Sequence, residues 1–166
     1  NDAFVQNVKS KIEAAVGGTM LTPAMKDAFD SGIEKLQQST ETVGLGKTAE
    51  SKNVATPTVL RVDYKTFADD TELAEEVFGP SSVIVEAKSR EEILAAARNL
   101  SGHLTATVYG SEEELMEYAD LIEILEQKVG RLLINGFPTG VEVCHAMVHG
   151  GPFPATTDSR STSVGT

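Results

Sequence analysis

The second half of the sequence alternates between short β-branched runs and longer helical segments. Strands are predicted at residues 82–86, 103–109 and 131–135. The helices between them begin with a serine that is followed three residues later by a glutamate, Ser89 with Glu92 and Ser111 with Glu114, which is the pattern of a capping box. The apolar spacing after Ser111 predicts one helix that continues to Gln127. Strands alternating with such helices predict βαβ units and a largely parallel sheet.

The first half of the sequence begins with two amphipathic helices. Residues 2–15 carry apolar side chains at four-residue spacing and are followed by two glycines that end the helix. Thr22 and Pro23 provide an N-cap and a first helical residue for the second helix. Strands are predicted at residues 40–46 and 56–62. Together these elements predict an α/β fold with a largely parallel open sheet and flanking helices, which normally binds ligands beyond the carboxyl ends of its strands.

The composition excludes several classes of partner. The chain has 166 residues, a length typical of one domain, and its 25 acidic and 14 basic side chains give a formal charge of −11. This excess argues against nucleic acid or anionic lipid, and no apolar run is long enough to cross a membrane. The lone Cys144 fits a reducing compartment, so we expect a cytoplasmic location. Because the sequence starts at Asn1 inside a helical pattern, we expect it to be a piece of a longer protein.

The tripeptide Gly46-Lys47-Thr48 has the residues that end a phosphate-binding loop. The full pattern needs a glycine five positions before Gly46, and Glu41 stands there, where its carboxylate would repel a phosphate. The residues that follow also lack the apolar stripe of a buried helix. A plain turn is therefore the favoured interpretation, and nucleotide hydrolysis is the alternative.

Four candidate metal ligands or nucleophiles lie close together near the end of the chain: Glu142, Cys144, His145 and His149. Two histidines at i and i+4 on a helix could hold zinc with a third ligand. Glycines and prolines on both sides argue against a helix, so we favour histidines in a pocket-lining loop and expect no bound metal. Adjacent residues such as Cys144 and His145 point apart, so we favour a buried thiol over a nucleophile.

The most informative motif is the hexapeptide of residues 75–80, Glu-Glu-Val-Phe-Gly-Pro. Its Gly-Pro end predicts a turn immediately before a β-branched strand. A carboxylate has two acceptor oxygens and can bind both hydroxyls of a ribose, while Phe78 offers a flat face beside a ring and Gly79 permits close approach of the backbone. The alternative interpretation is a solvated helix end followed by a turn.

This hexapeptide resembles the E-E-x-F-G-P motif of the aldehyde dehydrogenase superfamily, and the order of predicted elements is similar to that of its catalytic domain. Residues 131–135, Arg-Leu-Leu-Ile-Asn, resemble the family's strand that ends in Val-Asn. Residues 136–166 are similar to the 2,5-dioxovalerate (α-ketoglutarate semialdehyde) dehydrogenase branch, which lies close to NADP-dependent fatty aldehyde dehydrogenases. At residues 150–154 the chain has Gly-Gly-Pro-Phe-Pro, whereas most of the superfamily has Pro-Phe-Gly-Gly and a basic residue.

The resemblance covers the whole chain. It implies a catalytic-domain fragment over residues 1–135, and a substrate-pocket loop with a Ser/Thr-rich tail of the same domain over residues 136–166. Glu76 matches the family's glutamate that binds the nicotinamide ribose, and Phe78 matches the aromatic residue beside the cofactor. The residues that correspond to the wall of the substrate pocket are Asn135, Phe137, His149 and Phe153.

The implied reaction is the NAD(P)-dependent oxidation of an aldehyde, here 2,5-dioxopentanoate or a related semialdehyde, to a carboxylate through a thioester on a cysteine. This chain has no counterpart of that cysteine, of the glutamate base or of the domain that binds most of the NADP or NAD. Cys144 does not match the nucleophile. We therefore expect the isolated chain to be inactive and the intact enzyme to be a homo-oligomer. The alternative is a catalytically inactive binding or assembly module of the same fold.

Overall fold

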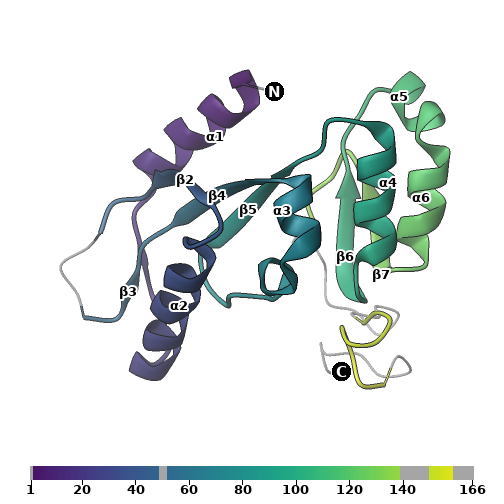
Figure 1. Ribbon diagram of the computed structural model, residues 1–166. Helices are drawn as coiled ribbons and strands as arrows, with labels where there is room; N and C mark the ends of the chain where they lie inside the picture. Colours follow the sequence, from purple (N-terminus) through teal and green to yellow (C-terminus); the bar gives the residue numbers. More distant parts are fainter. Residues whose placement is uncertain (1, 49–51, 139–149, 159–166) are drawn as a thin grey trace. The chain divides into compact units, whose positions relative to one another are not determined.

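The computed structural model describes residues 2–48, 52–138 and 150–158, and the chain divides into two compact units, Asn1–Lys88 and Ser89–Thr166 (Figure 1). The first unit contains α1 (Asp2–Ala14), β1 (Gly18–Thr19), α2 (Pro23–Leu36), β2 (Glu41–Leu45), β3 (Val54–Ala55), β4 (Thr58–Asp63), α3 (Tyr64–Asp69), the 3-10 helix η1 (Thr71–Ala74) and β5 (Ser81–Glu86). The second contains α4 (Arg90–Asn99), β6 (His103–Val108), α5 (Glu112–Glu117), α6 (Ala119–Glu126) and β7 (Val129–Ile134). Among these elements no helix is long and apolar enough to cross a membrane. The predicted division after residue 135 falls within the second unit and stays a prediction.

The first unit is built on a three-stranded sheet in the order β2-β4-β5. Strands β4 and β5 are parallel, with Thr58 opposite Ser81 and Asp63 opposite Glu86, whereas β2 pairs antiparallel with β4. The second unit contains the parallel pair β6–β7. These parallel pairs confirm the predicted α/β class, and β2 adds an antiparallel strand at the edge of the first sheet.

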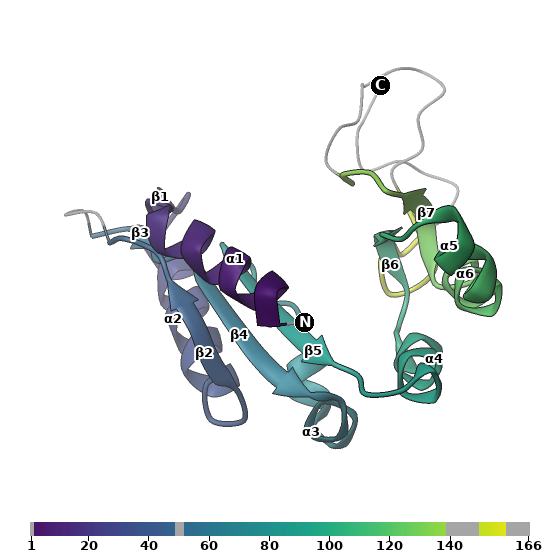
Figure 2. The same cartoon turned by 90° about the horizontal axis from the view of Figure 1, so that it is seen from above.

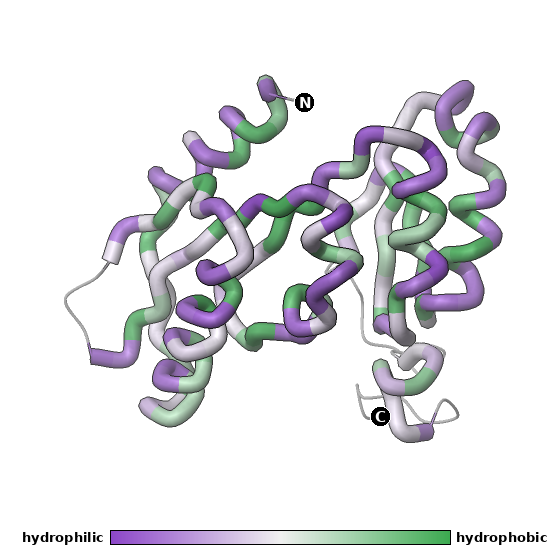
Figure 3. Tube along the Cα trace, in the orientation of Figure 1, coloured by the Kyte–Doolittle hydropathy of each residue, from purple (hydrophilic) through white to green (hydrophobic). Residues whose placement is uncertain are grey.

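The two faces of the first sheet pack against different helices because side chains alternate along each strand. On one face α1 places Val5 against Val43 and Val59. On the other face Leu36 of α2 packs with Leu60, which is fully buried. Figure 2 shows α1 lying along β2 and β4, and Figure 3 shows hydrophobic and hydrophilic residues alternating along α1, as an amphipathic helix requires.

Two short strands that the sequence did not predict pair the segments around the proposed turn at residues 46–48. Strands β1 and β3 pair antiparallel, with two residues each. Lys47 forms an isolated bridge with Val16, and its backbone N–H donates to the carbonyl of Ala15 at 2.8 Å. The N–H of Gly46 donates to the carbonyl of Pro57 at 2.7 Å. Because both N–H groups are already bonded, they are not free to hold a phosphate, which favours the structural interpretation of this tripeptide.

The predicted helix starts agree with the structure. The hydroxyl of Thr22 accepts a hydrogen bond from the N–H of Met25 at 3.2 Å, and Pro23 is the first helical residue. Ser111 and Glu114 form the predicted capping box, in which the Ser111 N–H donates to the Glu114 carboxylate at 2.8 Å and the Glu114 N–H donates to the Ser111 hydroxyl at 3.3 Å. Each bonded group satisfies a backbone donor that the first helical turn leaves free.

The single helix predicted up to Gln127 is wrong, because the structure divides it into α5 and α6 at Tyr118. The guanidinium of Arg90, the first residue of α4, lies 5.5 Å from the centre of the Tyr118 ring. It also donates to the carbonyl of Glu117 at 3.3 Å and to the carboxylate of Asp120 at 2.7 Å. These contacts come from a residue far away in the sequence, so helical spacing alone could not reveal the break.

Candidate functional site

The hexapeptide of residues 75–80 connects η1 to β5 in the first unit. Its end is fixed by Gly79, which has a φ of 154°, and by the carbonyl of Pro80, which accepts a hydrogen bond from the N–H of Thr58 at 2.9 Å. Because Thr58 and Ser81 begin the parallel strands β4 and β5, Phe78 and Gly79 lie near the amino ends of these strands. This agrees with the predicted turn immediately before a strand, and it differs from the general expectation that ligands bind beyond the carboxyl ends of parallel strands.

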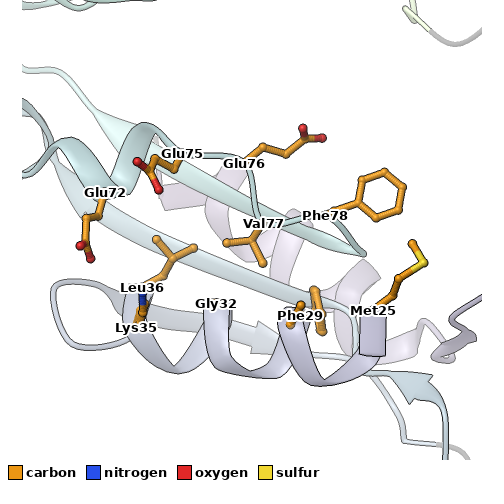
Figure 4. A pocket seen from close by; sticks show the side chains of 11 residues that line it. Met25, Phe29, Gly32, Lys35, Leu36, Glu72, Glu75, Glu76, Val77 and Phe78 are labelled. Carbon is orange, nitrogen blue, oxygen red and sulfur yellow. The ribbon is translucent and has the colours of Figure 1, made fainter. Parts of the chain in front are cut away.

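Two close contacts seat the loop on α2. Val77 packs on Gly32, where a Cβ atom would lie only 2.8 Å from Val77 Cγ1. Gly79 packs on the ring of Phe29, which is 3% exposed, so closely that a Cβ atom there would overlap the ring. Figure 4 shows Val77 directed at α2, with Glu76 and Phe78 directed away from it. The loop therefore presents the Glu76 carboxylate and the Phe78 ring on the side opposite to Val77, the residue that packs on α2.

The loop separates two open hollows on the surface of the first unit. The first has a volume of about 470 Å³ and lies between α2 and the loop, and the second, of about 500 Å³, extends towards the start of β5. Both are lined by Glu75, Glu76, Val77 and Phe78. The first hollow also receives the Glu72 carboxylate and a single cationic side chain, that of Lys35. This excess of carboxylates makes the hollow unfavourable for a phosphate and favourable for a neutral or cationic group.

The Glu76 carboxylate is exposed and, within the described part of the chain, makes no hydrogen bond or ion pair. Both of its oxygens are therefore available to accept hydrogen bonds from a diol. Phe78 is 65% exposed, so its ring is accessible to a bound group. A free carboxylate beside an exposed ring fits a ribose that carries a planar ring, as in a nicotinamide nucleotide.

The side chain of Asn135 is engaged by the backbone at the carboxyl end of β6. Its Oδ1 accepts from the Gly110 N–H at 3.0 Å, and its Nδ2 donates to the Gly110 carbonyl at 2.9 Å. Its own N–H donates to the carbonyl of Val108 at 2.9 Å, and its φ is 52°, in the left-handed region. Asn135 therefore joins the ends of β6 and β7, and a substrate would have to compete with these bonds.

The exposed pair Tyr109 and Phe137 lies at the same end of the second unit. Their rings meet edge to face with centres 6.5 Å apart, and the Tyr109 hydroxyl donates to the carbonyl of Gly136 at 2.7 Å. Phe137 is 82% exposed. A hollow of about 210 Å³ beside Tyr109 is lined mainly by apolar side chains from α4, β6, α5 and α6. Phe137, Asn135 and Tyr109 thus lie at the same end of the unit, and the substrate wall predicted for Asn135 and Phe137 stays a prediction.

Phe153 lies at the opposite end of the β6–β7 pair. A Cβ atom on Gly102, just before β6, would overlap the backbone of Pro152 and Phe153, and one on Gly130 would overlap the carbonyl of Gly150. A six-residue strand is roughly 16 Å long, so Phe153 and Phe137 cannot border one small pocket within this unit. His149, the fourth predicted wall residue, lies outside the described residues.

The candidate metal ligands and thiol near the end of the chain also lie outside the described residues. They are Glu142, Cys144, His145 and His149. Within residues 2–48, 52–138 and 150–158, no group of three or more histidine, cysteine or acidic side chains is placed to hold a metal ion. The loop that carries Glu76 and Phe78 offers an exposed carboxylate and an exposed ring, which are groups suited to a cofactor.

Similarity to known proteins extends over nearly the whole chain. Residues 4–152 match the aldehyde dehydrogenase family, and the chain belongs to that family. Over 99% of its length it is 39% identical to an alpha-ketoglutaric semialdehyde dehydrogenase of Acinetobacter baylyi and 41% identical to alpha-ketoglutaric semialdehyde dehydrogenase 2 of Azospirillum brasilense. The chain spans 32% of the length of each of these curated relatives.

The same fold occurs in solved aldehyde dehydrogenases. The succinic semialdehyde dehydrogenase from Streptococcus pyogenes, in complex with NADP+, aligns with a TM-score of 0.68 at 22% identity and covers 90% of this chain and 33% of that one. This likeness confirms the α/β fold of the aldehyde dehydrogenase catalytic-domain type, and the family match confirms the resemblance seen in the hexapeptide.

The sequence prediction missed the residues that hold the loop in place. Gly32 lies inside α2 and Phe29 lies one turn earlier, and both contact the loop. A glycine inside a helical pattern is a detectable signal, because it lowers helix stability unless packing requires it. Its partner Val77 could not be identified from spacing alone, since the contact joins segments that are distant in the sequence.

Proposed function

We propose that this chain supplies the nicotinamide-ribose contact and part of the substrate wall of an NAD(P)-dependent aldehyde dehydrogenase. The observation that carries the proposal is the pairing of a free Glu76 carboxylate with an exposed Phe78 ring on one side of a loop that is seated by Val77. Glu76 would accept hydrogen bonds from both ribose hydroxyls, and Phe78 would limit the movement of the adjoining ring. The carboxylates around the hollow suit the cationic oxidised nicotinamide and disfavour its phosphates.

The substrate proposed is an aldehyde that carries a carboxylate, 2,5-dioxopentanoate or a related semialdehyde. The support is the name of the two curated relatives at about 40% identity, alpha-ketoglutaric semialdehyde dehydrogenase. The acyl group would be carried as a thioester on a cysteine that this chain does not contain, and NADP or NAD, held mainly by another domain, would accept the hydride. We further propose a cytoplasmic homo-oligomer that binds neither nucleic acid nor membranes.

The proposed substrate wall is described at one end of the β6–β7 pair. Phe137 would provide an exposed apolar surface there, while Asn135 would hold the strand ends in place. His149 remains a proposed member of the wall. Phe153 would take part only from the opposite end of the pair, so its contribution is proposed as separate from that of Phe137.

The role of Glu76 is tested in the full-length protein by Glu76→Gln. This change keeps the size of the side chain but replaces one acceptor oxygen by a donor, so the ribose loses its bidentate partner. We expect the rate of hydride transfer to fall about tenfold or more, with the KM for the aldehyde nearly unchanged, because the change affects orientation more than aldehyde binding. Glu123→Gln, which changes an exposed carboxylate on α6 outside these hollows, serves as the matched control and should be nearly silent. Unchanged kinetics of Glu76→Gln would refute this role.

A further inference from the structure

Gly32 is placed where the local preference of the chain would select another residue. It lies inside the 14-residue helix α2, where glycine is less favourable than alanine because it has more conformational freedom to lose. A Cβ atom at this position would lie 2.8 Å from Cγ1 and 3.0 Å from Cγ2 of Val77. Such distances are shorter than the contacts that carbon atoms normally make. The missing side chain is therefore what allows Val77 to approach the helix.

Val77 is the inward-facing residue between the two outward-facing ones of the proposed site. It packs against the core cluster of Phe29 and Ile33 and also against the cluster that contains Leu36. Figure 4 shows Glu76 and Phe78 on either side of it, pointing away from α2. Any outward shift of Val77 must carry the neighbouring backbone with it, because consecutive peptide units are joined by only two soft dihedral angles per residue.

We propose that Gly32 is a positioning residue for the cofactor contact, acting through Val77. The contact between Gly32 and Val77 sets how far Glu76 and Phe78 stand from α2, and the contact between Gly79 and Phe29 fixes the other end of the loop. This proposal rests on the proposed function of Glu76. It adds that the height of the loop above the helix is set by the absence of one methyl group.

The opposite interpretation is that Gly32 serves only to let the protein fold. The two differ in what a methyl group at this position would change. A purely structural role predicts loss of stability and equal loss of every activity parameter. A positioning role predicts a folded protein with slow hydride transfer, because the Val77 side of the contact belongs to a loop beside an open hollow and can move outward.

The test uses the full-length protein with Gly32→Ala, Val77→Ala and the double variant, and Ser31→Ala as a matched control on an exposed position of the same helix. Gly32→Ala should slow single-turnover hydride transfer by about tenfold to a hundredfold, the effect of a displacement approaching 1 Å. The aldehyde KM and the Tm should change little. The Kd of NADPH, measured by its fluorescence, should rise about two- to tenfold, which corresponds to the loss of one hydrogen-bond contribution.

The double variant decides between the two roles, because it removes both methyl groups that the new Cβ would meet. We expect it to restore hydride transfer and NADPH binding to within about threefold of the wild type. Failure of this rescue, or wild-type behaviour of Gly32→Ala, would overturn the proposal. If Gly32→Ala does not fold, Val77→Ile tests the same contact from the loop side, and wild-type kinetics of that variant would overturn it equally. The Glu76→Gln variant separates the two proposals. If hydride transfer is slow in Glu76→Gln but normal in Gly32→Ala, only the positioning role is overturned. If hydride transfer is normal in Glu76→Gln, the proposed function itself is overturned.

Discussion

Replacing Asn135 by alanine removes two hydrogen bonds to Gly110 and leaves a residue with a Cβ atom in a left-handed conformation. Both bonds lie at the surface, so each is taken at the low end of the usual range, and the pair contributes about 1 kcal/mol. Holding alanine in the left-handed region adds about 1 kcal/mol, a cost that asparagine partly avoids. The expected decrease in the free energy of unfolding is therefore about 2 kcal/mol for Asn135→Ala. For Asn135→Gly it is about 1 kcal/mol, because glycine keeps the backbone unstrained.

Hydrogen exchange measures this effect at the atoms concerned, and urea unfolding of the same variants measures its size. The Gly110 N–H, which donates to Asn135 Oδ1, should lose protection in both variants. The N–H of residue 135, which donates to the Val108 carbonyl, should keep more of its protection and serves as an internal control. Equal stability of the alanine and glycine variants would refute the backbone argument. Unchanged exchange at Gly110 would show that the side chain does not join the strand ends.

Two further predictions concern the second unit and the isolated chain. The backbone N–H of Ser111, and then its hydroxyl, hold the pKa of the Glu114 carboxyl below its usual range. The stabilisation is complete above the pKa that the Glu114 carboxyl has in the unfolded chain, and it is lost as the pH falls through the lower pKa of the folded state. Glu114→Gln should therefore flatten that part of a profile of Tm against pH, taken from about pH 7 to about pH 3. An unchanged profile would contradict this prediction. The isolated 166-residue chain should not oxidise aldehydes, and steady NADPH formation from 2,5-dioxopentanoate by that chain alone would disprove it.

Local signals in the sequence predicted most of the helices and strands because their causes are local. Thr22 and Pro23 define the start of α2 with atoms from neighbouring residues, and the Ser111–Glu114 box does the same for α5. The break at Tyr118 was not predictable in this way, since it is accompanied by contacts from Arg90. The two-residue strands β1 and β3 were missed because they are too short to have a period.

The candidate site shows the same limit. The hexapeptide identified Glu76 and Phe78 as a pair, and the structure shows them side by side on one loop. It did not reveal that Val77 seats this loop on Gly32, because that contact depends on how α2 lies against the sheet. The sequence predicts Asn135 as the last residue of a strand, whereas β7 ends at Ile134, and the left-handed backbone of Asn135 and its bonds to Gly110 depend on the pairing of β6 with β7.

The backbone packing at the amino ends of β6 and β7 has a consequence for how this protein can evolve. Gly102 and Gly130 lie against the backbone of residues 150–153 with no room for a Cβ atom, so nearly every substitution at these two positions must move main chain. At the carboxyl ends, by contrast, the rings of Tyr109 and Phe137 are largely exposed and can change without leaving a cavity in the core. Sequence drift should therefore be restricted at the amino ends of the pair and permitted at the carboxyl ends, where mutations cost the least stability.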